Sequence, residues 1–343
     1  MQKTFALSLT VNPEKQAAIE IERLLKFPGF LKRDSFAKGR VEIVELRVDE
    51  RSRLSNVALS ELNRVIKCRV LVCAVLRRGD VVAPDGSFVL REGDRIFVTA
   101  STESLATLLD NLGIITKKVN HVMICGGGRV SYYLAQQLEK DGMTVRLIEK
   151  DPKHCEELAA LLPKTEIIND DASNTFVLKR ENLESCDALV TATGMDELNM
   201  IISLYGTKHG VSQVITKLGH MENGSMIDQL PIGSTIWPKD LCCNGIVRYI
   251  RAMHNQTGAA VSVHSIADGK AEAIEFHVEE KKPYCDKPLK NMKVKQNILV
   301  ACITHGGVTE LPGGDSVIRE GDTVVVVTTR NDIIYKLDDI FEA

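Results

Sequence analysis

Apolar residues between about residues 117 and 226 fall into short runs that alternate with amphipathic stretches. Each run is short enough for a buried strand, and each stretch between runs has the spacing of a helix. Strands alternating with helices are typical of a parallel, doubly wound α/β sheet with right-handed crossovers. The pattern predicts strands at 122–125, 144–148, 166–168, 188–191 and 213–216, and helices at 132–140, after 151–152, at 174–179 and at 196–209.

The sequence on either side of this segment is repeated. Arg-Glu-Gly-Asp at 91–94 recurs at 319–322, residues 36–50 resemble 266–280, and 9–13 resemble 234–238. Internal repetition of this kind indicates duplicated structural units. We therefore expect five regions: 1–28, the remnant of a first module with its helix; 29–116, a small β-rich domain; 117–235, the α/β domain; 236–262, a linking helix; and 263–343, a second small α+β domain. On this interpretation the chain begins inside a module.

Each repeat combines an amphipathic helix with a β-rich segment. The helices are expected at 14–26 and 242–253, and their apolar face either packs on its own domain or forms a crossover or dimer contact. In the second copy, dense apolar runs predict strands at 298–304 and 323–328, followed by a closing helix at 332–341. The repeated Glu-Gly-Asp is interpreted as a structural turn, in which glycine supplies a positive φ.

Composition narrows the class of protein. The chain has 343 residues, 44% hydrophobic and 26% charged, and its net charge is −3 from 43 basic and 46 acidic residues. This balance shows no basic bias that would favour a nucleic-acid partner. No apolar run is long enough to cross a membrane, and we expect no direct membrane insertion. The nine cysteines form no CxxC pattern, which favours buried reduced thiols over disulfides or a metal site.

The first predicted strand of the α/β segment runs directly into a glycine-rich loop that opens a helix. In such a loop the first glycine allows a tight turn, the second lets the backbone approach a pyrophosphate, and the third position must be small. Phosphate would lie on backbone N–H groups at the helix N-terminus, with a basic side chain beside it. The loop consists of Gly126, Gly127, Gly128, Arg129, Val130 and Ser131. Gly126 and Gly128 are the first and second glycines of the motif, and Ser131 occupies the third, small position.

An acidic residue ends the second predicted strand. Glu149, followed by Lys150, lies 23 positions after Gly126, where a carboxylate accepts hydrogen bonds from ribose hydroxyls. A carboxylate repels a 2′-phosphate, so NAD(H) or an adenine nucleotide is favoured over NADP. The alternative is a Rossmann-type fold without a ligand.

Two further loops follow predicted strands at the same edge of the sheet, where ligands bind in doubly wound folds. One follows the third strand and the other follows the fourth. Helix capping would explain one polar residue of the first loop but not the whole cluster. Together the loops add Asp170, Asp171, Ala172, Ser173, Thr193, Gly194 and Asp196 as candidate nucleotide-binding residues.

These motifs, in this order and over essentially the whole chain, resemble the regulators of conductance of potassium, the RCK or KTN domains, and most closely the TrkA-type subunits of Trk potassium-uptake systems. The resemblance implies a Rossmann domain flanked by two small C-terminal-type domains. It also implies a nucleotide-sensing subunit that is not an enzyme and has no catalytic residues. Such a subunit would be cytoplasmic and peripheral to the membrane, would self-associate, and would bind a TrkH- or TrkG-like potassium-translocating subunit. Its implied ligand is NAD(H), or else ATP or ADP.

Two rival functions are compatible with the same modules. One is regulation of another cation transporter or antiporter. The other is an NAD-dependent oxidoreductase, which needs a general acid or base beside the nicotinamide. Of the eight histidines only His220 could face the cleft, and a solvent-exposed or capping histidine is the favoured interpretation of it. The small duplicated domains do not suit a substrate pocket.

Overall fold

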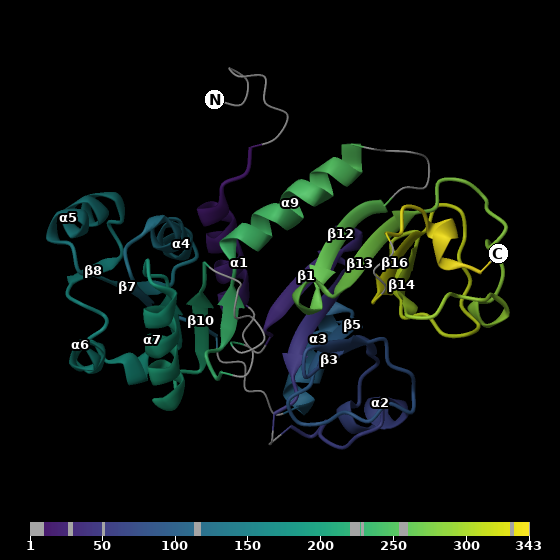
Figure 1. Cartoon of the computed structure of the whole chain (residues 1–343), viewed down its shortest axis with the longest axis horizontal. Coiled ribbons are helices and arrows are strands. Elements are labelled where there is room, and N and C mark those ends of the chain that lie inside the picture. The colour runs from purple at the N-terminus through teal and green to yellow at the C-terminus, as the bar shows by residue number, and fades with distance from the viewer. Residues whose placement is uncertain are drawn as a thin grey trace. The chain divides into compact units, whose positions relative to one another are not determined.

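The computed structural model describes residues 10–26, 30–49, 52–112, 118–219, 227, 230–253, 260–329 and 333–342. The chain divides into two compact units (Figure 1). The first combines Met1–Leu31 with Thr116–Cys243, and the second combines Lys32–Ile115 with Asn244–Ala343. Among the described residues no helix is both long and apolar enough to cross a membrane.

The first unit contains a six-stranded parallel sheet in the order β11-β10-β9-β6-β7-β8. This topology confirms the predicted doubly wound sheet. Its strands are β6 (His121–Cys125), β7 (Thr144–Glu149), β8 (Glu166–Asn169), β9 (Ala188–Thr191), β10 (Gln213–Lys217) and β11 (Ser234–Ile236). The helices between them are α4 (Arg129–Lys140), α5 (Pro152–Leu161), α6 (Thr175–Arg180) and α7 (Asp196–Lys208), with a 3-10 turn η3 (Leu183–Ser185).

Alternate residues of the central strands enter two different cores. Val122 and Ile124 of β6 pack with apolar residues of α4, whereas Met123 and Cys125 pack with those of α6 and α7. Successive side chains of a strand point to opposite faces, so helices cover both faces of this sheet. The near-continuous apolar runs seen in the sequence follow from burial on both sides.

Helix α1 (Pro13–Lys26) packs on this unit rather than on the small domain that follows it in sequence. Its apolar face lies in the same core as α4. The Gln213 amide donates to the Leu24 carbonyl at 2.8 Å, and Lys26 lies 2.9 Å from the Asp141 carboxylate. The buried residues of this face are Ala17, Ala18, Ile21, Leu24 and Leu25.

The second unit contains two antiparallel five-stranded sheets with the same strand order, β1-β2-β5-β3-β4 and β12-β13-β16-β14-β15. The shared order shows that the sequence repeat is also a structural repeat. The first sheet consists of β1 (Lys32–Phe36), β2 (Val41–Arg47), β3 (Leu71–Arg77), β4 (Asp80–Val82) and β5 (Arg95–Ala100). The second consists of β12 (Ala260–Ile266), β13 (Ala271–His277), β14 (Ile298–His305), β15 (Val308–Glu310) and β16 (Thr323–Thr328). The helices are α2 (Leu62–Ile66), α3 (Thr102–Asn111) and α9 (Pro238–Met253), of which α9 begins in the first unit and ends in the second.

The two small domains share one hydrophobic core. It contains residues of both sheets, among them Phe36 and Phe97 from the first copy and Val325 and Val327 from the second. Asp34 and His264, which occupy equivalent positions of the two copies, contact each other at 2.9 Å. Contact between equivalent positions is expected of residues that lie close to a local two-fold axis between the copies.

The repeated Arg-Glu-Gly-Asp is a turn in both copies. Gly93 and Gly321 have φ values of +86° and +87°. The buried Asp94 carboxylate accepts the Arg91 N–H at 2.7 Å and pairs with Arg77, and Asp322 accepts the Arg319 N–H at 2.5 Å. Each aspartate therefore accepts a hydrogen bond from a backbone N–H group of its own turn.

The predicted closing helix at 332–341 is wrong over its described residues, 333–341. The structure has only the 3-10 turn η6 (Leu337–Ile340) there. The Asp339 carboxylate accepts the N–H groups of Tyr335 and Lys336, which fixes a tight turn in place of continuous helix. The first copy differs, because Ser101 caps a ten-residue helix α3.

Candidate nucleotide-binding site

Gly126 turns the chain at the carboxyl end of β6. It has φ of +98°, and its N–H donates to the Ile148 carbonyl at 2.8 Å. A Cβ at this position would lie 2.8 Å from the Thr193 Cα. Glycine is therefore required here for the backbone conformation and for the close approach of the loop after β9.

Gly127 is held by the acidic residue at the end of β7. Its N–H donates to Glu149 Oε2 at 2.7 Å, while Glu149 Oε1 accepts the Asp151 N–H at 2.9 Å. A Cβ on Gly127 would lie 2.7 Å from Leu158 Cδ1. The Glu149 carboxylate thus organises the glycine loop, and its remaining lone pairs are what a ribose hydroxyl would use.

Gly128 differs from the two preceding glycines. It is the N-cap of α4, which begins at Arg129 and so three residues before the predicted start. Its φ of −62° suits any residue, and a Cβ there would meet no atom within 4 Å. Packing and backbone conformation therefore do not require glycine at Gly128. The space beside it is open at the N-terminus of a twelve-residue helix, where the backbone dipole favours an anion.

The next three predicted residues have different surroundings. Arg129 is 80% exposed and its Nη1 lies 3.6 Å from Glu14 Oε1 of α1, so it is accessible beside the helix terminus. Val130 is buried in the core of the sheet. Ser131 is fully buried, and its hydroxyl has no hydrogen-bond partner among the described residues.

The loop after β8 is organised by its own side chains. Asp170 pairs with Arg180 at 2.8 Å, and Asp171 Oδ1 accepts the Ser173 N–H at 2.8 Å. Hydrogen bonds from backbone N–H groups hold the pKa of both aspartates below the usual range, helped by Arg180 at Asp170 and by the Ser173 side chain at Asp171. Ala172 is buried, and the cap of α6 is Asn174 rather than one of the predicted residues. Lys150 is exposed nearby and favours the charged form of Asp171.

The loop after β9 packs directly on the glycine loop through Thr193. The Thr193 hydroxyl and N–H both donate to Asn199 Oδ1, at 2.7 and 2.9 Å. A Cβ on Gly194 would meet no atom within 4 Å. Both oxygens of Asp196 accept the Gly219 N–H, at 2.9 and 2.8 Å, so this carboxylate connects the start of α7 to the loop after β10.

Lys217 is a residue of this edge that the sequence analysis did not identify. It ends β10, and its Nζ donates to the Thr193 carbonyl at 2.7 Å. Burial lowers its pKa, against the opposing effect of Asp196. The sequence carried one usable signal, because Lys217 immediately follows the last apolar run of the sheet and so lies at its carboxyl edge.

The structure thus brings the predicted loops together along one edge of the sheet. Gly126 contacts Thr193, Gly127 contacts Glu149, and the Asp170 N–H donates to the Glu149 carbonyl at 3.1 Å. The edge offers the open N-terminus of α4, the Glu149 carboxylate and the cationic side chains of Arg129, Lys150 and Lys217. These are the groups that bind the phosphates and ribose of a nucleotide. Among the described residues, no cluster of His, Cys, Asp or Glu is placed to hold a metal ion.

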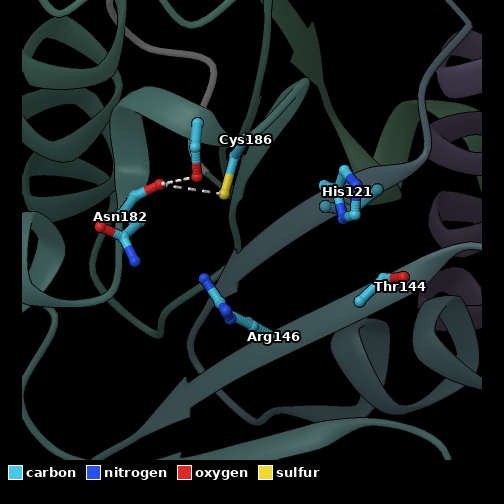
Figure 2. Close-up of a pocket in the computed structure, with 7 residues that line it drawn as sticks. His121, Thr144, Arg146, Asn182 and Cys186 are labelled. Carbon is cyan, nitrogen blue, oxygen red and sulfur yellow. Dashed lines mark hydrogen bonds between the residues drawn. The ribbon is translucent and has the colours of Figure 1, made fainter.

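A separate pocket of about 290 Å³ lies at the opposite, amino-terminal edge of β6 and β7 (Figure 2). His121, Thr144, Arg146, Asn182 and Cys186 line it. The Arg146 guanidinium is already bound to Glu166 Oε2 at 2.8 Å and to the Glu181 carbonyl at 2.9 Å. The positive charge in this pocket is therefore neutralised by the protein itself.

The fold is a Rossmann-type α/β domain joined to a pair of small antiparallel domains. Family comparison agrees: a TrkA-N domain matches residues 122–238, and a TrkA-C domain matches twice, at 43–113 and 273–341. The chain therefore combines one TrkA-N domain with two TrkA-C domains.

Similar proteins cover most of the chain. The Trk system potassium uptake protein TrkA of Haemophilus influenzae is 27% identical over 338 residues, which is 97% of this chain and 72% of that protein. TrkA homolog 1 of Methanosarcina mazei is 27% identical over 321 residues, 93% of this chain and 70% of that protein. The GsuK RCK domain matches in fold with a TM-score of 0.54 and 14% identity, covering 94% of this chain and 69% of that one. The GsuK channel bound to NAD matches with a TM-score of 0.52 and 14% identity, covering 95% and 57%.

Proposed function

We propose that this chain is a nucleotide-sensing regulatory subunit of a potassium-uptake system and that the nucleotide binds at the glycine loop of the TrkA-N domain. One observation carries the proposal: Gly128 lies at a helix N-terminus beside open space that the packing of the protein does not explain. A pyrophosphate would accept hydrogen bonds from N–H groups of this terminus. Arg129 and Lys217 would add positive charge.

The ligand proposed is NAD(H), with ATP or ADP as the alternative. Glu149 would accept hydrogen bonds from the hydroxyls of the adenosine ribose, and its charge would repel the 2′-phosphate of NADPH. Asp170, Asp171, Ala172 and Ser173 would lie on the adenosine side. Thr193, Gly194 and Asp196 would lie on the other half of the ligand, because β9 and β7 flank β6 on opposite sides. The fold match to a channel solved with NAD supports this choice.

The proposed role is regulatory rather than catalytic. The relatives named above are potassium uptake proteins, and the fold matches are to RCK domains. His220, the histidine considered for an acid–base role, lies outside the described residues. We propose a cytoplasmic subunit peripheral to the membrane, bound to a TrkH- or TrkG-like potassium-translocating subunit. A nucleotide would regulate that subunit only by binding two conformations of the assembly with different affinity.

Self-association is supported by the two copies of the amphipathic helix. When Pro13 is aligned with Pro238, Ile21 and Leu25 of α1 correspond in sequence to Ile246 and Ile250 of α9. Ile21 and Leu25 are fully buried against the Rossmann unit, whereas Ile246 and Ile250 are 41% and 48% exposed. We propose that this exposed face of α9 contacts a second copy of the chain. An Ile250→Asp variant is expected to lower the mass measured by light scattering, and an unchanged mass would argue against this contact.

Calorimetric titration of the purified chain with NADH, NAD, ATP, ADP and NADPH tests the proposed ligand. We expect saturable binding of NADH or ATP and little binding of NADPH. A Glu149→Gln variant should lose affinity about tenfold or more, since a charged hydrogen bond contributes roughly 1.5–3 kcal/mol. The control is Glu166→Gln, a glutamate of the same sheet that pairs with Arg146 at its other edge. If none of the five nucleotides binds, the proposed site is wrong.

A further inference from the structure

His154, near the start of α5, contacts the glycine loop through its side chain. Its Nε2 lies 2.9 Å from the Gly127 carbonyl oxygen, and its Nδ1 lies 3.1 Å from Glu157 Oε2. A carbonyl and a carboxylate can only accept hydrogen bonds. Both ring nitrogens are therefore satisfied only when both carry a proton, that is, in the imidazolium form.

The Gly127 carbonyl belongs to the same peptide unit as the Gly128 N–H. Because a trans peptide is planar, fixing the carbonyl on one side fixes the direction of the N–H on the other. The preceding peptide is fixed in the same way, since the Gly127 N–H is bonded to Glu149. His154 and Glu149 thus orient two successive peptide units, and the second of them presents the Gly128 N–H at the open end of α4.

We propose that His154 is a positioning residue of the nucleotide site, and that its protonated ring orients the Gly128 N–H toward the phosphate of the ligand. This inference rests on the proposed function and adds to it a regulation of nucleotide affinity by pH. A positive charge on the ring also polarises the peptide unit, which strengthens the Gly128 N–H as a donor. Nucleotide affinity should consequently depend on pH.

The charged groups around the ring favour protonation. The hydrogen bond to Glu157 contributes most to raising the pKa of His154, followed by the bond to the Gly127 carbonyl, while partial burial opposes them. Glu157 lies on α5 itself, Glu149 faces the ring from the end of β7, and the loop before α4 contributes only its carbonyl. Asp151 caps α5 and accepts the backbone N–H of His154, and the positive end of the α5 dipole acts against the ring charge.

The sign of the effect follows from the raised pKa. At pH values below that pKa the ring is charged, the Gly127 carbonyl is held, and affinity is highest. As pH rises through the pKa, the ring loses a proton and one of its two hydrogen bonds, and affinity falls. A bound phosphate raises the pKa further, so binding should take up protons from solution at pH values near and above the pKa of the free protein.

The test is NADH titration of the full chain by calorimetry between about pH 6 and about pH 8, in buffers of different ionisation enthalpy. For the unaltered chain we expect affinity to fall about tenfold across this range and protons to be taken up, as for loss of a charged hydrogen bond. His154→Gln keeps an amide donor for the Gly127 carbonyl but cannot titrate. It should bind NADH with a pH-independent affinity and reduced proton uptake.

His209→Gln is the matched control. His209 also pairs with a glutamate, Glu184 at 2.8 Å, but it lies at the C-cap of α7 and away from the glycine loop. This variant should retain the pH profile of the unaltered chain. A pH profile that is the same in His154→Gln as in the unaltered chain would overturn the inference and leave the proposed function standing. Absence of NADH binding at every pH would instead overturn the proposed function.

Discussion

Replacing Gly127 by alanine and replacing Gly128 by alanine should have different effects, the first on stability and the second on nucleotide affinity. A Cβ at Gly127 would lie 2.7 Å from Leu158 Cδ1 and 3.0 Å from both Cγ and Oε2 of Glu149. Leu158 is only 2% exposed and Glu149 is held by two backbone N–H groups, so neither can yield freely. Overpacking of this kind costs typically about 1–3 kcal/mol, and we expect Gly127→Ala to destabilise the Rossmann unit by about 2 kcal/mol.

A Cβ at Gly128 meets nothing and the φ of −62° is allowed for alanine. Loss of a glycine N-cap and the smaller entropy of the unfolded chain act in opposite directions, so stability should change by less than about 1 kcal/mol. The methyl group would nevertheless occupy the space proposed for the pyrophosphate. Gly128→Ala should therefore reduce NADH affinity at least about tenfold while the protein remains folded.

The assay combines urea unfolding with NADH titration. Trp237 is the single tryptophan of the chain and belongs to the Rossmann unit, so its fluorescence reports unfolding of that unit. NADH binding by Gly128→Ala that is as tight as in the unaltered chain would contradict a phosphate site at Gly128. Unfolding of Gly127→Ala at the same urea concentration as the unaltered chain would contradict the close packing around Gly127.

Three further outcomes are expected. Ser131→Ala removes a buried hydroxyl that has no hydrogen-bond partner among the described residues, and should stabilise the Rossmann unit by about 1 kcal/mol in the urea assay, whereas a loss of stability would show that the hydroxyl is used. Ile21→Ala leaves a cavity between α1 and the sheet and should cost about 3 kcal/mol, and a near-zero cost would contradict the docking of α1. Burial raises the pKa of Cys125 to about 12, so a thiol reagent at neutral pH should label Cys125 only on unfolding but should label the exposed Cys243 quickly. Early labelling of Cys125 would contradict its burial.

Much of the fold was predictable because it depends on local periodicity. The alternation of apolar runs and amphipathic stretches predicted β6 to β10 to within a residue or two, and the Asp151-Pro152 pair correctly indicated the start of α5. The repeat predicted two similar β-rich domains. The failed helix near the C-terminus has a tertiary cause: Asp339 binds backbone N–H groups of its own turn, an alternative that apolar spacing cannot reveal.

The composition of the glycine loop was predictable, but the way its peptides are held was not. The sequence indicated Gly126, Gly128 and Glu149 because their spacing along a strand, turn and helix is fixed by local geometry. His154 and Lys217 reach the site from α5 and β10, through side-chain rotamers that only tertiary packing selects. The sequence indicated Asp170 as a candidate nucleotide-binding residue, but its pairing with Arg180 depends on how α6 folds back on its loop.

A crystal structure of the chain grown with NADH would show whether the glycine loop binds the nucleotide. We expect the pyrophosphate to lie against the Gly128 N–H at the start of α4 and a ribose hydroxyl to donate to Glu149. A nucleotide bound instead in the pocket at the amino-terminal edge of β6 and β7, or a glycine loop without bound nucleotide at saturating NADH, would contradict the proposed site.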